Sequence, residues 1–272
     1  MLDPFQLPFM QRAALEVALL APLAGVLGAQ IVLRRLAFFT HGVGAAAFPG
    51  LVVAGPAGIP PALAALGVGG AFAGLLERLA RTRALAYDAA TALLLVAALA
   101  SGVVLASDVF DSGAEVDQLL FGSLLAIGER EVVATAIAVL VAAVATLMAR
   151  RSWIASGFDP ASTRSLGLSV GPADWALLGA ITVAVVASLD AVGALLVGAI
   201  LVVPAATMRL FARRVLTLEL GSGLLALAEG LAGLWIAFEL DAPPGAVIAV
   251  LGGIVFASCL GIRVLRPGTG AT

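Results

Sequence analysis

Long apolar runs are the feature of this sequence that most restricts its fold. Nine of them approach the roughly 20 apolar residues that a helix needs to cross about 30 Å of hydrocarbon. The chain is 62% hydrophobic and 12% charged, whereas soluble domains average roughly 45–50% apolar and 25% charged residues. We therefore expect an all-α, polytopic membrane helix bundle forming a single transmembrane domain, residues 1–272. The runs are approximately 13–33, 36–54, 62–79, 89–107, 132–148, 175–189, 191–208, 216–238 and 246–265.

The number of spans depends on how the region around Asp190 is divided. The sixth and seventh runs are short and nearly continuous there. They form two spans, one long helix or a helix broken at its middle. We expect about nine spans, and eight are possible.

The arginines predict how the bundle is oriented, because cytoplasmic loops of membrane proteins collect positive charge. The chain has no lysine, and its arginines follow the first, third, fifth, seventh and ninth runs. Only Arg12 and Arg130 fall on the opposite side. This alternation places the N-terminus outside and the C-terminus inside. The net charge of −2 gives no case for a nucleic-acid partner.

An acidic loop, residues about 106–131, falls on the outer side in this orientation. It serves as a docking face for an extracytoplasmic protein, as a funnel for cations or as an ordinary solvated loop. The run at 119–128 within it is too short to cross the membrane. The acidic residues are Asp108, Asp111, Glu115 and Asp117.

The longest cytoplasmic connection, residues about 149–174, contains signals for a short helix. Asp159 is a capping carboxylate, and Pro160 suits the first helical position. Gly167, between Leu166 and Leu168, is a typical stop signal. We favour a docking helix over a simple connector, since a connector needs no defined start and end.

Six motifs stand in order along nearly the whole chain, and together they resemble the permease subunits of bacterial zinc and manganese ABC importers. None is decisive alone, but they fall on consistent sides of the membrane. They are IVLRRLAFF at 31–39 with PG at 49–50, LFGSLLA at 120–126, FDP at 158–160, LGL at 166–168, VGALLVGAILVVPAAT at 192–207 and LDAPPGA at 240–246.

The resemblance implies a multi-pass protein of the bacterial cytoplasmic (inner) membrane that works as part of a complex. Two permease chains would form the pathway, two cytoplasmic ATPase subunits would bind ATP and drive it, and an extracytoplasmic solute-binding protein would deliver the metal. The chain lacks a GxxxxGK[ST] phosphate loop, so we expect no enzyme activity of this kind in it. We expect no permanently bound cofactor, only a transported zinc or manganese ion. The residues that would couple to the ATPase are Phe158, Asp159, Pro160, Leu166 and Gly167.

His41, the only histidine, marks a departure from the family pattern Gly-Asp-x-x-Ser-His-x-x-x-Pro-Gly. Aligned on Pro49 and Gly50, the family aspartate falls on His41 and the family histidine on Ala45. Thr40 takes the position of the glycine, and we place Thr40, Pro49 and Gly50 along the pathway. His41 is either a metal contact or a packed histidine that donates to a backbone carbonyl. Imidazole in place of carboxylate favours zinc, since hard carboxylate sites suit manganese.

Two acidic residues, one between the sixth and seventh runs and one within the eighth, are further metal candidates, because charge at membrane depth is costly and marks pathways. Asp190 is either an acidic lining of the outer gate or an exposed residue at a helix turn. Glu229 either lines the pathway or is a protonated glutamate bonded to a neighbouring helix.

Other classes of protein remain as alternatives. The nearest are ABC permeases for manganese or iron, or for a chelate such as haem or a siderophore. A secondary transporter should show matched half-repeats, and none is convincing. An intramembrane protease needs motifs that a single histidine does not provide, and a structural scaffold does not explain the capped cytoplasmic helix.

Overall fold

The computed structural model describes residues 4–81, 86–109, 127–158, 170–192 and 197–265. The regular elements within these ranges are all helices, which confirms the all-α prediction for this part of the chain. They are η1 (Pro4–Gln6), α1 (Pro8–Leu33), α2 (Ala37–Ala57), α3 (Pro61–Arg81), α4 (Tyr87–Val104), η2 (Leu105–Val109), α6 (Glu129–Phe158), α8 (Val170–Val192), α9 (Val197–Arg209), α10 (Val215–Leu240) and α11 (Pro244–Leu265).

Eight of the described helices are long and apolar enough to cross a membrane, which matches the lower of the two span numbers expected. The ninth, α9, has 13 residues. At 1.5 Å per residue it is about 20 Å long, short of the roughly 30 Å of hydrocarbon. Asp190 lies in the last turn of α8, close to where that helix ends at Val192. The orientation of the termini stays a prediction.

The sequence fixes several helix ends through backbone chemistry. Gly58, at φ 65°, ends α2 in the left-handed region, and Pro61 then begins α3. Asp241 ends α10 in the same conformation, with φ 51°, and Pro244 begins α11. A left-handed residue halts a helix and proline favours a first turn, so these turns are short. Arg35, at φ 59°, similarly separates α1 from α2.

Helix α6 runs further than the apolar run 132–148 indicated. It continues for about ten residues past Met148 and ends at Phe158, so at 1.5 Å per residue it extends about 15 Å beyond the apolar run. Residues 149–158 and 170–174 of the connection predicted to be cytoplasmic are therefore helical, and its residues 159–169 lie outside the described ranges.

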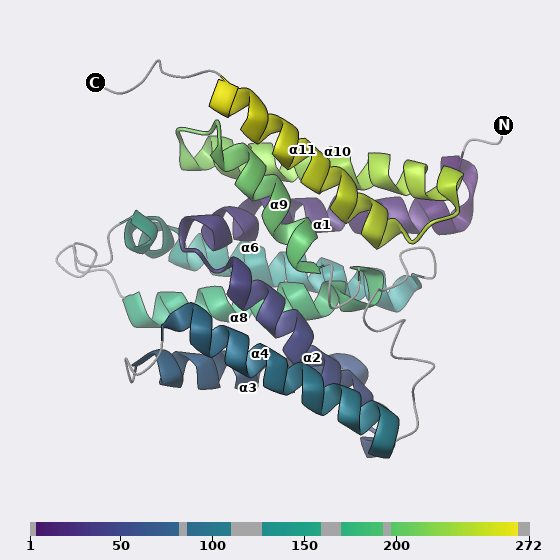
Figure 1. Ribbon diagram of the computed structural model, residues 1–272, viewed down its shortest axis with the longest axis vertical. Coiled ribbons are helices and arrows are strands. Elements are labelled where there is room, and N and C mark those ends of the chain that lie inside the picture. Colours follow the sequence, from purple (N-terminus) through teal and green to yellow (C-terminus); the bar gives the residue numbers. More distant parts are fainter. Residues whose placement is uncertain (1–3, 82–85, 110–126, 159–169, 193–196, 266–272) are drawn as a thin grey trace.

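Figure 1 shows how the bundle is arranged, with α9, α10 and α11 at the top, α2, α3 and α4 at the bottom, and α6 and α8 between. Helix α1 packs on α10, α9 and α6, while α2 packs on α3 and α4. The approach of α1 to α10 needs Gly25, where a Cβ atom would lie 2.7 Å from the carbonyl oxygen of Glu219. At Gly28 a Cβ atom would overlap the carbonyl oxygen of Leu201 in α9. Close contact of this kind is how membrane helices pack.

Candidate functional site

His41 lies on the second turn of α2 and is half-buried. Helix α9 passes directly beside it, because a Cβ atom built on Gly198 would lie 3.6 Å from Nδ1 of His41 and 3.7 Å from its Cα atom. The imidazole of His41 forms no hydrogen bond or ion pair with another residue in the part of the chain that the structure describes. Within that part, the alternative of a histidine bonded to a backbone carbonyl is not observed.

The neighbours of His41 on α2 are occupied in packing. Thr40 is fully buried, and its hydroxyl donates to the carbonyl oxygen of Leu36 over 3.1 Å. A Cβ atom at Gly50 would lie 2.7 Å from the carbonyl oxygen of Ala64 in α3, so α2 and α3 meet there. Pro49 is also buried. The role of Thr40, Pro49 and Gly50 in the pathway stays a prediction.

Glu229 lies in α10 and only 5% of its surface is exposed. It borders a cavity of about 20 Å³ enclosed by α1, α9, α10 and α11, whose other lining residues are apolar, proline or glycine. The Oε2 atom lies against Gly252, where a Cβ atom would come within 3.3 Å of it. The Oε1 atom has no hydrogen-bond partner among the described residues. The bonded-glutamate alternative is therefore not observed there either, and the cavity has room for roughly one water molecule.

The candidate metal residues do not form one cluster. Helix α9 separates two of them: its residue Gly198 faces His41, while its residue Val203 lines the cavity of Glu229. Asp190 is at the end of α8, and its side chain is not among those described. Within the described ranges, no group of three or more histidine, cysteine or acidic side chains is placed to hold a metal ion.

The acidic outer loop is described only at its edge. Asp108 lies in the single π-helical turn η2 that follows α4. Asp111, Glu115 and Asp117 lie outside the described residues, and so do four of the five proposed coupling residues, Asp159, Pro160, Leu166 and Gly167. The fifth, Phe158, is the last residue of α6. Both roles stay predictions.

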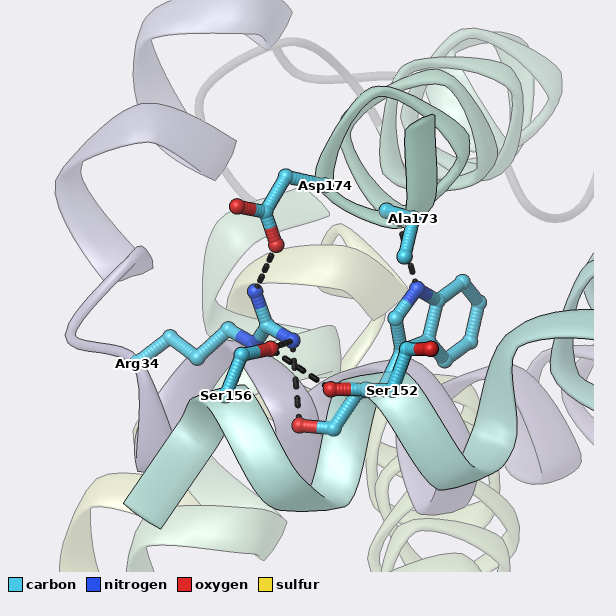
Figure 2. A network of polar contacts seen from close by, with 6 residues as sticks. Arg34, Ser152, Ser156, Ala173 and Asp174 are labelled. Atoms are coloured by element: carbon cyan, nitrogen blue, oxygen red, sulfur yellow. Dashed lines mark hydrogen bonds and ion pairs between the residues drawn. The ribbon is translucent and has the colours of Figure 1, made fainter. Parts of the chain in front are cut away.

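A polar network at the predicted cytoplasmic side joins three helices around Arg34, the residue that follows α1. Its Nη1 atom forms an ion pair with Oδ1 of Asp174 at 2.5 Å. Its Nη2 atom donates to the carbonyl oxygen of Trp153 over 3.0 Å and to Oγ of Ser156 over 2.6 Å. Figure 2 shows the guanidinium lying between α8, which carries Asp174, and the end of α6, which carries Ser156. The α1–α2 turn is thereby held to both helices.

The same network also contains a direct hydrogen bond between α6 and α8. The indole nitrogen of Trp153, a fully buried side chain, donates to the carbonyl oxygen of Ala173 over 2.7 Å. The hydroxyl of Ser156 donates to the carbonyl oxygen of Ser152 over 2.6 Å (Figure 2). The network thus ties together the two helix ends that flank residues 159–169. The sequence analysis used Arg34 for orientation and as part of the IVLRRLAFF motif, and missed this role.

The sequence analysis also did not identify two further buried carboxylates. Glu16 in α1 is fully buried, and the hydroxyl of Thr135 in α6 donates to its Oε1 atom over 2.5 Å. Glu219 in α10 pairs with Arg150 of α6 through a 2.7 Å contact. An acidic residue inside an apolar run is the signal that identified Glu229, and it applies equally to Glu16 and Glu219. Both tie α6 to its neighbours.

Ionisable side chains enclosed between apolar, membrane-length helices are typical of multi-pass membrane proteins, where such groups mark pathways, relays or sensors. Eight of the described helices have this length and apolar character. The ABC 3 transport family matches residues 6–262, and the chain belongs to this family. The family resemblance noted in the sequence is thereby confirmed.

Individual relatives are similar over most of their length. The "Manganese transport system membrane protein MntC" of Halalkalibacterium halodurans is 27% identical over 254 residues, which cover 92% of this chain and 85% of the relative. The "Chelated iron transport system membrane protein YfeD" of Yersinia pestis is 28% identical over 269 residues, covering 97% and 89%. The solved structure "PsaBC from Streptococcus pneumoniae in complex with Fab" shares the fold, with a TM-score of 0.85, 22% identity and coverage of 95% and 93%.

Proposed function

We propose that this chain is the permease subunit of an ABC importer for a divalent transition metal. The observation that carries the proposal is His41, a half-buried imidazole between α2 and α9 with no hydrogen bond to any described residue. Unbonded imidazole is a common ligand for transition metals. The proposal is supported by membership of the ABC 3 transport family and by relatives named for manganese and chelated iron transport.

The complex that we propose contains two copies of this chain, two cytoplasmic ATPase subunits and an extracytoplasmic solute-binding protein, in a bacterial cytoplasmic membrane. ATP is bound and hydrolysed in the partner subunits, so this chain is not itself an enzyme and keeps no permanent cofactor. Its work is to expose the metal first to one side of the membrane and then to the other. The family assignment supports this division of labour.

One imidazole per chain suits a passing ion. Two copies related by a two-fold axis would present two histidines, and the remaining ligands of the ion would be water. A site with few protein ligands holds an ion weakly, and a transported ion must leave its site as readily as it enters. Ala45, which is buried where the family carries its histidine, adds no ligand.

The residues 159–169 are proposed to dock on the ATPase, and the network around Arg34 supports this role. It fixes the ends of α6 and α8, which flank those residues, to the turn that precedes α2. His41 lies seven residues after Arg34, on the second turn of α2. A movement of the docked segment would therefore reach the helix that carries the proposed metal contact.

Zinc is the metal that His41 favours, since a neutral imidazole replaces a hard carboxylate. The names of the relatives, which refer to manganese and iron, do not support zinc. The double variant His41→Asp/Ala45→His restores the family pair on one helical face. It should shift uptake from zinc towards manganese if His41 sets the preference.

The test is ATP-driven uptake into vesicles that contain the reconstituted complex. Labelled zinc, manganese, iron and an iron–siderophore chelate are supplied separately at limiting concentration. His41→Ala should reduce uptake of the preferred ion at least tenfold. The control Ser101→Ala, which loses only an exposed hydroxyl bonded within α4, should leave it unchanged. Normal uptake by His41→Ala would remove this residue from the mechanism, and transport of no metal by the wild-type complex would end the metal assignment.

A further inference from the structure

A second pocket, of about 710 Å³, lies at the predicted cytoplasmic end of the bundle, away from His41 and Glu229. It is formed by the end of α9, the turn into α10 and the last turn of α11. Four arginines line it, and no acidic residue is among the lining residues that the structure describes. The arginines are Arg209, Arg213, Arg214 and Arg263.

The side chains of these four arginines have no acidic partner in the described ranges. By contrast, Arg34 and Arg150 on the same side each pair with a carboxylate. Arg263 instead donates to the carbonyl oxygen of Leu210 over 2.7 Å, which uses one of its five N–H donors. The guanidinium groups of the other three form no hydrogen bond or ion pair with a described residue. The general excess of arginine on this side explains their presence but not their convergence on one pocket.

The pocket lies where lipid headgroups are expected. Helix α11 has 22 residues, so it is about 33 Å long and nearly matches the hydrocarbon thickness. Arg263 is in its last turn. Only 17% of the residues in the apolar stretch of α11 are buried, so its sides are available to acyl chains. Two apolar lining residues, Phe211 and Ile262, are 50% and 49% exposed. A ligand here meets positive charge next to open apolar surface.

We propose that this pocket binds the headgroup of an anionic phospholipid in the adjacent leaflet. Guanidinium groups bind phosphate oxygens through paired hydrogen bonds, and basic pockets between transmembrane helices are suited to anionic headgroups. A volume of about 710 Å³ is within the range for a bound small molecule. The exposed apolar side chains at the rim would contact the acyl chains. This inference does not depend on the transported substrate.

The test uses the full-length permease in neutral detergent, with bound lipid counted by native mass spectrometry. Phosphatidylglycerol is compared with phosphatidylcholine of the same acyl chains. Each arginine near an anionic surface adds to the binding free energy, and the two contributions multiply in the affinity. Arg213→Gln/Arg214→Gln should therefore weaken phosphatidylglycerol binding roughly 30-fold. The control Arg78→Gln/Arg151→Gln removes the same charge from two exposed arginines outside the pocket. It should change binding less than about threefold, because screened surface charge acts over only about 10 Å.

The outcomes separate a lipid site from its alternatives. Preference for phosphatidylglycerol that is lost only in the pocket variant, and that millimolar inorganic phosphate does not remove, supports the proposal. Equal loss in both variants would show general surface attraction and overturn it. Displacement of the lipid by free phosphate would indicate an anion site without lipid specificity, and also overturns it. If Arg213→Gln/Arg214→Gln binds lipid normally but no longer assembles with the ATPase, the pocket belongs to a protein partner and the proposal is overturned.

Discussion

Replacing Arg34 with methionine should cost the bundle a measurable part of its stability. The ion pair with Asp174 contributes roughly 1 kcal/mol, because Asp174 is 40% exposed and solvent screens it. The bonds to the carbonyl oxygen of Trp153 and to Ser156 contribute roughly 1.5 kcal/mol each, as hydrogen bonds from a charged donor. The sum is about 4 kcal/mol. It is an upper bound, because the hydroxyl of Ser156 keeps its bond to Ser152.

Tryptophan fluorescence during unfolding in mixed micelles can follow this loss. Trp153 is fully buried and belongs to the network, while Trp175 and Trp235 are 44% and 49% exposed. Opening of the network should therefore shift the emission of Trp153 to longer wavelength. In Arg34→Met this shift should occur at lower denaturant, and far-ultraviolet circular dichroism should report the loss of helix at the same point if unfolding is cooperative.

Arg35 provides the matched control, since it is the next residue, equally charged and exposed. Arg35→Met should change the free energy of unfolding by less than about 0.5 kcal/mol, as is usual for surface substitutions. A double-mutant cycle of Arg34→Met with Asp174→Asn should give a coupling energy of about 1 kcal/mol. If Arg34→Met and Arg35→Met unfold alike, the three hydrogen bonds do not hold the helices together and the reasoning is refuted.

Three further substitutions test other parts of the bundle. Glu229→Gln should lower metal uptake several-fold with an unchanged amount of permease in the membrane by immunoblot, because the amide keeps the shape without the charge; unchanged uptake would exclude Glu229 from the pathway. Gly28→Val should lower the free energy of unfolding by roughly 1–3 kcal/mol, because the new side chain overlaps the backbone of α9. The midpoint of thermal aggregation should fall accordingly. The control Gly67→Val, whose Cβ atom would lie in open space, should leave the midpoint unchanged. Thr135→Val removes a donor to buried Glu16 and should destabilise by roughly 1–3 kcal/mol in the micelle assay; wild-type stability would contradict this.

The sequence predicted eight helices that are long and apolar enough to cross a membrane, because this property depends on length and hydropathy alone; at the seventh apolar run the described helix, α9, is shorter. It placed the ends less well where a helix leaves the hydrocarbon. The last turns of α6 carry Arg150, Arg151 and Ser152, which look like the start of a loop although they remain helical. Hydropathy measures the preference for lipid and not the continuity of backbone hydrogen bonds.

The sequence also identified His41 but not its surroundings. A single histidine in an apolar run can be recognised without a structure, because ionisable groups are costly there. Its neighbour Gly198 belongs to a helix far along the chain, and only the packing of α2 on α9 brings them together. The partners of Arg34 were hidden for the same reason, since Asp174 lies 140 residues away. Charge counting predicts the side of the membrane and says nothing about pairing.

The length of α6 has a mechanical consequence. Measured from the point near Met148 where the hydrocarbon should end, the rod has arms of about 15 Å and 30 Å. Any tilt about that fulcrum displaces the tip beside Glu129 roughly twice as far as the opposite tip, and in the reverse direction. A small displacement of the α6 end on the arginine-rich side would therefore produce a displacement about twice as large at the opposite end, without any bend in the helix.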